Sequence, residues 1–401
     1  MGNRIKNGIR GTDFLLYLTC IVTSAFGCLM VYSATRNDAL EAGRFMDTEC
    51  LVMILASAAG IVFCLIISFI DYNSIVRLWP VIGAVCLLLI IALFKWGEAP
   101  ADRPNARCWL TIFQIGDRKV TFQPSELAKV GFLVTFSAHL DRVRNEINKI
   151  KNVALLTFHA LIPIGLIILT DDLGSAIIFG FMFIGMMFAA GLHLRYFAIA
   201  GGAFAAAAPL LWTKFLSNFH RQRILAIYYP QALSQSVYNT RIYQQQRAVD
   251  AIGSGGFFGD GLFKGTYTQS AAGIPVNESD MVFSVVGEEL GFIGGFLLLA
   301  ALAFIILRII HTGKESHNLT GAVICYGTAF MIAVQVLMNI GMCLKLLPCI
   351  GITLPFISAG GSSGLCVYLA LGLVMSIYRF NHSSPEPENF SYSRLMTPFG
   401  E

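Results

Sequence analysis

The stretch VNESDMVFSVVGEELGF, residues 276–292, runs directly into IGGFLLLAALAFIIL, residues 293–307. The second part is entirely apolar, and a run of this kind predicts a membrane-spanning helix, which needs about 20 residues. The first part carries carboxylates close to the start of that helix. They are Glu278, Asp280, Glu288 and Glu289. The stretch therefore predicts a membrane-embedded fold with acidic side chains at the mouth of one span.

The composition of the 401-residue chain agrees with a membrane protein. Hydrophobic residues make up 56% of it and charged residues only 13%, whereas soluble domains carry about 25% charged residues. The net charge of +4 is small. Because the sequence contains no dense basic stripe, it excludes nucleic acid as a partner.

The ten cysteines and seven histidines show neither metal-ligand spacing nor a C-x-x-C motif. Most of the cysteines lie inside apolar runs, where they act as small packing residues. Cys50 and Cys108 fall in or near outer loops, so one disulfide between them stays open as an alternative. The glycine-rich stretch 251–266, AIGSGGFFGDGLFKGT, lacks the strand and helix around a nucleotide-binding loop, so no organic cofactor is expected.

The predicted fold class is an all-α polytopic membrane protein with one domain over residues 1–401. The basic N-terminus leads into an apolar run with no small-residue cleavage site after it, so the first span is expected to be uncleaved. About ten segments qualify as spans by length and apolarity. They are 13–34, 50–70, 76–95, 124–140, 153–170, 173–190, 194–212, 281–307, 318–343 and 350–378.

Lysines and arginines in short loops predict the orientation of these spans. In a ten-span arrangement they fall on one side, which is therefore cytoplasmic and holds both termini, including the tail 381–401. They are Arg4, Lys6, Arg10, Arg142, Arg144, Lys149, Lys151, Arg308, Lys314 and Arg379. The other side receives segments 35–49, 96–123 and 213–280. The last is far longer than the usual connection of about 4–6 residues and is predicted to be a large extracytoplasmic loop between helices 7 and 8.

Asp280 has two compatible interpretations. It can be a helix-start residue, with Asn277 as the cap and Asp280 at the third helical position, where a carboxylate suits the positive helix end. It can also be a functional acid held at the outer mouth of the span.

Glu288 follows on the same helix face, about 12 Å deeper at 1.5 Å per residue. A carboxylate inside the membrane costs at least about 2.5 kcal/mol on insertion scales and marks a function or a buried partner. Alternatively, the span begins near Leu290 and leaves both glutamates at the interface. Small residues that favour close helix contact recur on this face. They are Gly287, Gly291 and Gly295.

A second polar group lies in RCWLTIFQIGDRKVTFQPSELAKVGF, residues 107–132. Glu126 and Lys129 are spaced i, i+3 and can pair on one helix face. Such a pair is either purely structural or, facing a cavity, presents an ammonium for a phosphate. Arg107 adds a planar fork suited to phosphate oxygens. Trp109 and Gln123 complete this group of candidates.

Two further polar stretches lie at the ends of predicted spans. In TDDLGSA, residues 170–176, Asp172 is either a helix cap or a site residue. In LPFISAGGSSG, residues 354–364, Pro355 interrupts the helix and small residues follow. The hydroxyls that could line a cavity there belong to Ser358, Ser362 and Ser363.

Taken together, these motifs resemble the SEDS (shape, elongation, division and sporulation) family, whose members include RodA, FtsW and SpoVE. The matching stretches FQPSELAK, DLGSA, AIGSGGFFGDGL, SDMVFSVVGEELGFIG and LPFISAGGSS occur in the family's order between residues 107 and 364. The stretch 339–355, NIGMCLKLLPCIGITLP, is more similar to the RodA branch, which favours a role in cell elongation and shape.

The resemblance implies a glycosyltransferase that polymerises lipid II into peptidoglycan strands at the outer face of the cytoplasmic membrane. It implies a class B penicillin-binding protein as partner and a divalent cation, Mg²⁺ or Mn²⁺. The family's essential aspartate falls on Asp280, and its Glu and Lys fall on Glu126 and Lys129. Asp280 is then the general base for the acceptor hydroxyl, while Lys129 and Arg107 stabilise the leaving diphosphate.

The long outer loop would form a roof that engages sugars or phosphates. Its arginines are Arg221, Arg223, Arg241 and Arg247. The chain departs from the family pattern at Thr170 and Asp171, where the family usually has Gln and Pro. It also departs at Ala359, in place of Tyr, and at the stretch 46–51, MDTECL, in place of basic residues. The roles at these positions stay open.

Three other functions are compatible with ten spans and intramembrane acids. A lipid II flippase uses the same features for transport. A non-catalytic scaffold for the penicillin-binding protein would not need Asp280. A division-type or sporulation-type SEDS polymerase would share the chemistry and differ in its partner.

Overall fold

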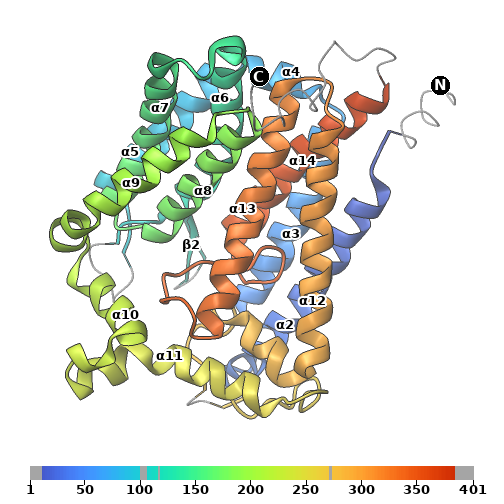
Figure 1. Cartoon of the computed structure of the whole chain (residues 1–401). Coiled ribbons are helices and arrows are strands. Elements are labelled where there is room, and N and C mark those ends of the chain that lie inside the picture. Colours follow the sequence, from blue (N-terminus) through green and yellow to red (C-terminus); the bar gives the residue numbers. More distant parts are fainter. Residues whose placement is uncertain (1–10, 100–105, 116–117, 271–272, 384–401) are drawn as a thin grey trace, which may run out of the picture.

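The computed structural model describes residues 11–99, 106–115, 118–270 and 273–383, and it is almost entirely helical (Figure 1). Among these residues, eight helices are long and apolar enough to cross a membrane. They are α2 (Phe14–Glu41), α3 (Thr48–Ser68), α5 (Trp79–Trp96), α7 (Ile150–Leu169), α9 (Leu194–Leu210, continued by a π-helical turn), α12 (Val282–Lys314), α13 (Leu319–Cys343) and α14 (Gly361–Ser383).

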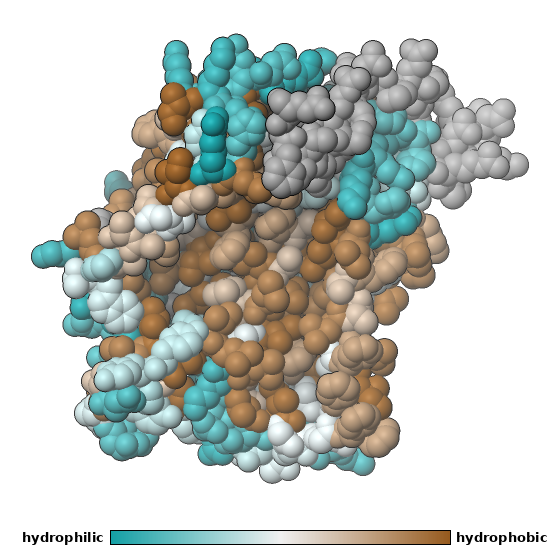
Figure 2. All heavy atoms as spheres, viewed as in Figure 1, coloured by the Kyte–Doolittle hydropathy of each residue, from teal (hydrophilic) through white to brown (hydrophobic). Residues whose placement is uncertain are grey.

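Two further helices, α6 (Pro124–Arg142) and α8 (Leu173–Ala189), occupy the remaining predicted spans. The first carries buried charge and the second is short, which is why neither stands out by apolarity alone. The predicted all-α polytopic fold is therefore confirmed. Large apolar side chains cover the middle of the molecule, with polar residues at both ends (Figure 2), as a lipid-embedded surface requires.

The first and last spans differ from the sequence prediction. The first helix continues to Glu41, so much of the expected loop 35–49 is helical. The last helix begins at Gly361, whereas the sequence placed its start near residue 350. Residues 344–360 are non-helical because Pro355 has no N–H to continue a helix, and Lys345, Gly351 and Phe356 have positive φ.

The predicted loop 213–280 is largely helical. It contains α10 (Asn218–Tyr228), a 3-10 turn at Pro230–Ala232, and α11 (Gln235–Ser254). Both helices lie at one end of the bundle, and α11 runs to the start of α12 (Figure 1). The same end receives an antiparallel hairpin, β1 (Leu110–Ile115) with β2 (Arg118–Phe122), which the sequence analysis did not predict.

Helix α12 is broken at Gly291, whose φ of 63° is accessible to glycine but strained for other residues. The break leaves the carbonyls of Glu288 and Glu289 without helical partners. The glycine-rich segment satisfies them, because Asp260 N donates to Glu288 O at 2.9 Å and Gly261 N donates to Glu289 O at 3.0 Å.

A Cβ on Gly291 would collide with the backbone at Gly259 and Phe257, and one on Gly287 would meet Ile252 of α11. Gly287 and Gly291 of the predicted ridge therefore pack against α11 and residues 257–259, whereas Gly295 faces Phe283 of α12 itself.

At the opposite end of the bundle, the start of the first helix meets the ends of α12 and α14. Arg308 Nε lies 2.6 Å from Asp13 Oδ2, and Arg379 Nη2 lies 2.8 Å from Thr12 Oγ1. The predicted cytoplasmic residues Arg4, Lys6 and Arg10, and residues 384–401 of the tail, lie outside the described residues. Two short helices, α4 (Tyr72–Arg77) and a 3-10 turn at Arg144–Glu146, complete the described elements.

Cys50 and Cys108 are both described, and no disulfide joins them. Cys108 Sγ lies 3.6 Å from the carbonyl of Thr170, and Cys50 Sγ lies 3.9 Å from the carbonyl of Cys28. The bridge that the sequence left open is therefore absent from the structure.

Candidate active site

Asp280 lies in a tight turn immediately before α12, and not inside the helix as the capping interpretation required. The helix begins at Val282, and Asn277 donates its side-chain amide to Thr268 O at 3.5 Å instead of capping. The turn is closed by Met281 N, which donates to Val276 O at 3.2 Å. Asp280 itself is half-buried. A carboxylate in this position is held by its backbone and is partly exposed.

The non-helical segment 344–360 holds this turn from the other side. Ser358 Oγ donates to Ser279 O at 2.6 Å, and Ala359 N donates to Glu278 O at 2.8 Å. Ser358 Oγ also accepts from Leu354 N at 2.7 Å. Ser358 was predicted to line a cavity, and the structure gives it a supporting role for the acidic turn as well.

A second polar cluster forms where α6 begins. Lys129 Nζ lies 2.7 Å from Glu126 Oε1, and both side chains are buried. The i, i+3 pairing predicted from the sequence is present. An ammonium has three donors, and the bond to Glu126 uses one of them, while Glu126 Oε2 and Gln335 Oε1 are buried without a hydrogen bond. The pair is therefore buried and has unused hydrogen-bonding capacity.

Gln123, Ser125 and Asp172 connect this pair to the turn between α7 and α8. Asp172 Oδ2 accepts from Gln123 Nε2 and from Ser125 Oγ, each at 2.9 Å. Its Oδ1 accepts from Ser175 N at 3.0 Å and so caps α8. Both interpretations of Asp172, as cap and as member of the polar cluster, are therefore satisfied by one carboxylate.

A polar cavity of about 20 Å³ lies beside the second cluster, and no residue of the Asp280 turn lines it. That volume holds about one water molecule. Its wall combines residues from α6, α8, α13 and the segment 344–360. They are Gln123, Glu126, Ser175, Ile178, Gln335, Gly351, Ile352 and Thr353. The cavity therefore holds no more than about one water molecule. A sugar or a diphosphate could enter it only if helices or side chains moved apart.

Asn339 joins the Asp280 turn to the segment 344–360, and it was not among the residues predicted from the sequence. Its Nδ2 donates to Asp280 O and to Ile352 O, each at 2.8 Å. Asn339 stands one helical turn after Gln335 on α13, so the two polar side chains share a face. The signal in the sequence was available: two amide side chains at i, i+4 inside an otherwise apolar helix mark a polar surface inside the bundle.

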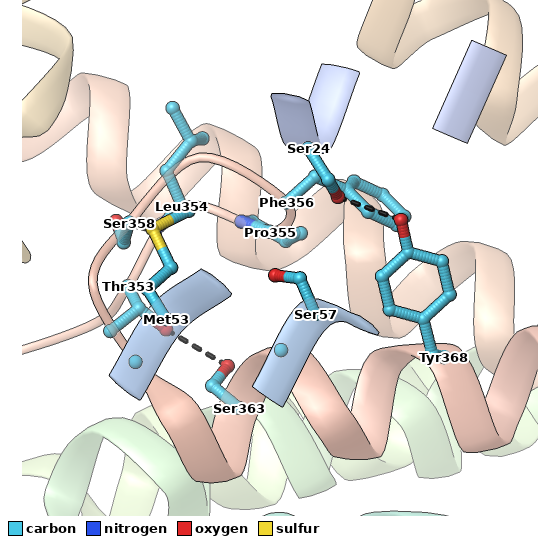
Figure 3. Close-up of a pocket in the computed structure, with 12 residues that line it drawn as sticks. Ser24, Met53, Ser57, Thr353, Leu354, Pro355, Phe356, Ser358, Ser363 and Tyr368 are labelled. Carbon is cyan, nitrogen blue, oxygen red and sulfur yellow. Dashed lines mark hydrogen bonds between the residues drawn. The ribbon is translucent and has the colours of Figure 1, made fainter. Parts of the chain in front are cut away.

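A smaller cavity of about 10 Å³ lies under the same segment (Figure 3). Hydroxyl groups surround it: Thr353 donates to Ser363 at 3.0 Å, and Ser24 and Tyr368 share a hydrogen bond of 2.7 Å. Ser57 points into the cavity between them (Figure 3). These contacts pack the first, second and last spans around the turn that carries the serines.

Glu288 and Glu289 bind residues 267–269 and Ser33. Neither glutamate lines either cavity. The carboxylate of Glu288 accepts from Tyr267 N at 2.6 Å, and from Thr268 N at 2.8 Å and Thr268 Oγ1 at 2.6 Å. Glu289 Oε1 accepts from Ser33 Oγ at 2.6 Å. The sequence left three possibilities open for these glutamates: a function, a buried partner or a position at the membrane interface. The structure shows buried partners.

The remaining predicted site residues lie away from the cavity. Arg107 is exposed and donates to Phe94 O at 3.1 Å. Trp109 pairs through its backbone with Glu98. Ser362 Oγ accepts from Gln123 N at 3.2 Å, which places it at the start of α6.

Two of the roof arginines flank one aromatic ring. Arg223 and Arg241 lie 4.3 and 4.5 Å from the ring centre of Phe219, on α10 and α11. Arg223 also donates to Cys349 O at 2.6 Å. The roof therefore combines positive charge with an aromatic face, next to the segment that holds the Asp280 turn.

Next to Asp280, burial and the neighbouring Glu49 carboxylate raise the pKa of Glu278 from 4.5 to about 7. Across the described residues, no group of three or more His, Cys, Asp or Glu side chains could hold a metal ion. The residues present therefore do not fit a divalent cation held by the protein alone.

The residues 13–383 match the family model of FtsW, RodA and SpoVE, described as "Cell cycle protein". The chain belongs to the SEDS family. It is 31% identical over 91% of its length to the "Probable peptidoglycan glycosyltransferase FtsW" of Geobacter metallireducens, covering 94% of that protein. It is 29% identical over 92% of its length to the "Peptidoglycan glycosyltransferase MrdB" of Escherichia coli K12, covering 92% of that protein.

Solved structures agree with the fold of this SEDS protein. A chain from a peptidoglycan synthase complex, described as coordinating polymerisation and crosslinking, matches with a TM-score of 0.76 at 25% identity, covering 93% of this chain and 99% of that one. RodA from Thermus thermophilus matches with a TM-score of 0.65 at 24% identity, covering 93% and 98%. The SEDS protein described here is thus a multi-pass membrane protein and a peptidoglycan glycosyltransferase.

Replacing Lys129 by Met should leave the Glu126 carboxylate buried without its cation. Breaking a buried pair in this way costs about 3–5 kcal/mol, so the thermal midpoint in detergent should fall clearly. The double variant Glu126→Leu/Lys129→Met removes both charges and should recover most of that stability. Glycan polymerisation should stay at least about 100-fold down in both variants if the charge serves catalysis.

The exposed pair Glu146 and Lys149 is a matched control, with the same residue types, the same spacing and a distance of 2.6 Å. Lys149→Met should change stability by less than about 1 kcal/mol and leave polymerisation intact. Full polymerisation by the stable double variant would show that the buried pair is structural only.

Glu278 should make the stability of the protein depend on pH. Since its folded pKa is about 7 against 4.5 for the free group, the folded state keeps a proton that the unfolded chain releases between these values. The stabilisation from this bound proton is complete below pH 4.5 and is lost as pH rises through about 7. The thermal midpoint should therefore fall between pH 5 and 8, and Glu278→Gln should reduce the slope. The exposed Glu41→Gln variant should keep the wild-type slope; a Glu278→Gln curve parallel to wild type would contradict the assignment.

Proposed function

We propose that this SEDS protein polymerises lipid II at the outer face of the cytoplasmic membrane, with Asp280 as the general base. The observation that carries the proposal is the Asp280 turn, held by hydrogen bonds from Ser358, Ala359 and Asn339. A sugar hydroxyl is a poor nucleophile at neutral pH, so it needs a positioned carboxylate to accept its proton. Positioning of donor and acceptor contributes further rate.

The leaving group in this proposal is the lipid diphosphate. Its developing charge needs a preorganised cation, and Lys129 is the buried ammonium beside the polar cavity. Glu126 orients it, and Gln123 and Asp172 extend the polar surface toward the roof. Arg223 and Arg241 are the roof cations that we propose for the second phosphate or the sugars. Because the cavity is only water-sized, substrate entry must separate these walls.

We propose that the divalent cation, Mg²⁺ or Mn²⁺, arrives with the diphosphate. The described residues offer no protein cage for it, whereas phosphate oxygens are ligands that Mg²⁺ prefers. The reaction steps assigned to Asp280 and Lys129 do not depend on the ion.

The orientation is proposed from charge. The described basic residues Arg308 and Arg379 lie at the end of the bundle where the first helix begins, and α10 and α11 lie at the other end (Figure 1). By the positive-inside rule, the end that carries Arg308 and Arg379 is cytoplasmic. Asp280 and the roof then face the outside of the cell.

Asp280→Asn should abolish glycan polymerisation by purified protein in detergent, because the amide cannot accept the proton. The side chains have equal size, so expression and thermal midpoint should stay near wild type. The assay compares polymer length on gels for both proteins with lipid II. Asp260→Asn, in the glycine-rich segment, is the control and should polymerise normally. Full polymer yield from Asp280→Asn would end the general-base assignment.

We further propose a role in cell elongation with a class B penicillin-binding protein as partner. The support is the stretch 339–355 and the similarity to a chain of a peptidoglycan synthase complex. Copurification from native membranes should recover an elongation-type transpeptidase, and depletion of the SEDS protein should give rounded cells. Recovery of a division-type transpeptidase, with filamentous cells on depletion, would contradict the elongation role.

A further inference from the structure

Two adjacent carboxylates at the turn between α7 and α8 bind different parts of the molecule. Asp172 belongs to the polar cluster of the site, through Gln123 and Ser125. Asp171 Oδ1 instead lies 3.2 Å from Nε2 of His220 on α10. The imidazole is only 5% exposed, so water competes weakly for this bond.

The backbone of the turn separates the two side chains. Asp171 has φ of 61°, in the left-handed region. Asp tolerates this conformation better than most residues do, but the backbone is still strained there. Asp171 N donates to Ile168 O at 3.0 Å and Asp172 N donates to Ile167 O at 3.3 Å, which closes the end of α7. The strained residue is thus held in place, with its carboxylate directed to α10.

Helix α10 connects two walls of the site. Apart from its packing on α11, it is hydrogen-bonded to the segment 344–360 through Arg223, to Cys349 O at 2.6 Å, and through Tyr228, to Leu346 O at 2.9 Å. The bond from His220 connects it to the α7–α8 turn, which carries Asp172. The water-sized cavity lies between these two walls, so the position of α10 affects how far they stand apart.

His220 faces the carboxylate of Asp171 and, edge to face, the ring of Phe219, which Arg223 and Arg241 flank. A neutral imidazole donates from Nε2 to the carboxylate, and an imidazolium does the same with added charge. The contact therefore forms in either protonation state of the histidine, because an oxygen of Asp171 accepts the bond in both cases.

We propose that Asp171 and His220 are a positioning pair for the polymerase reaction. Their bond holds α10 against the α7–α8 turn and thereby sets the separation of the two walls that the lipid-linked substrate must pass. The pair acts on substrate binding and not on the chemical step, since neither residue lines the cavity. The inference rests on the proposed function, and Asp171 is one of the positions at which this chain departs from the family pattern.

The test uses the full-length protein with Asp171→Ala, His220→Ala and the double variant. Each should raise the KM for lipid II about tenfold, the factor that corresponds to about 1.4 kcal/mol, while kcat stays within about twofold of wild type. The double variant should be no worse than either single variant, because one shared contact is lost. The conservative variant His220→Gln keeps a donor and should recover KM to within about threefold.

Hydrogen exchange supplies a readout that is independent of activity. Amides of residues 218–228 should exchange at least about tenfold faster in both alanine variants, while those of α13 should not change. Asp141→Asn, on a surface pair at the other end of α6, is the control and should alter neither KM nor exchange.

Additive effects in the double variant, or unchanged exchange in α10, would overturn the positioning pair. If wild-type protein failed to polymerise lipid II, the proposed function would fail, while the exchange experiment would still decide whether the pair holds α10.

Discussion

The side-chain amide of Asn339 is the contact on which the arrangement of the site depends. A single Nδ2 group donates to the carbonyls of Asp280 and Ile352, each at 2.8 Å. The first carbonyl belongs to the acidic turn before α12, and the second to the non-helical segment that walls the polar cavity. Unpaired backbone groups are costly inside a membrane protein. Asn339 therefore pairs with one backbone carbonyl in each of the two non-helical segments. The same contact fixes the distance between the segments.

The same constraint explains the two glutamates that follow the turn. The break at Gly291 leaves carbonyls of α12 exposed, and the glycine-rich segment binds them with its own N–H groups. The carboxylate of Glu288 completes this joint by accepting from Tyr267 and Thr268. A buried charge is tolerated where several donors converge on it. The glutamates therefore hold residues 267–269 against α12.

The two polar clusters of the site differ in burial. Glu126 and Lys129 are both buried, so their charges are weakly screened, and the unused donors of Lys129 remain available to an incoming anion. Asp280 and Glu278 lie in a half-buried turn, and the raised pKa of Glu278 reflects burial together with the nearby Glu49.

The sequence by itself determined the helical spans, the pairing of Glu126 with Lys129 and the cap formed by Asp172, because each depends on neighbours along one helix. The family motifs pointed to Asp280 as well. Only the tertiary structure decided the partners of Glu288, the place of Arg107, the helical start at Gly361 and the roles of Gln335 and Asn339. These depend on segments distant in the chain, and no local periodicity records which backbone carbonyl a side chain will meet once the helices pack. The contact between Asp171 and His220 is of the same kind, since the two residues are 49 positions apart and nothing in the intervening sequence signals that they will touch.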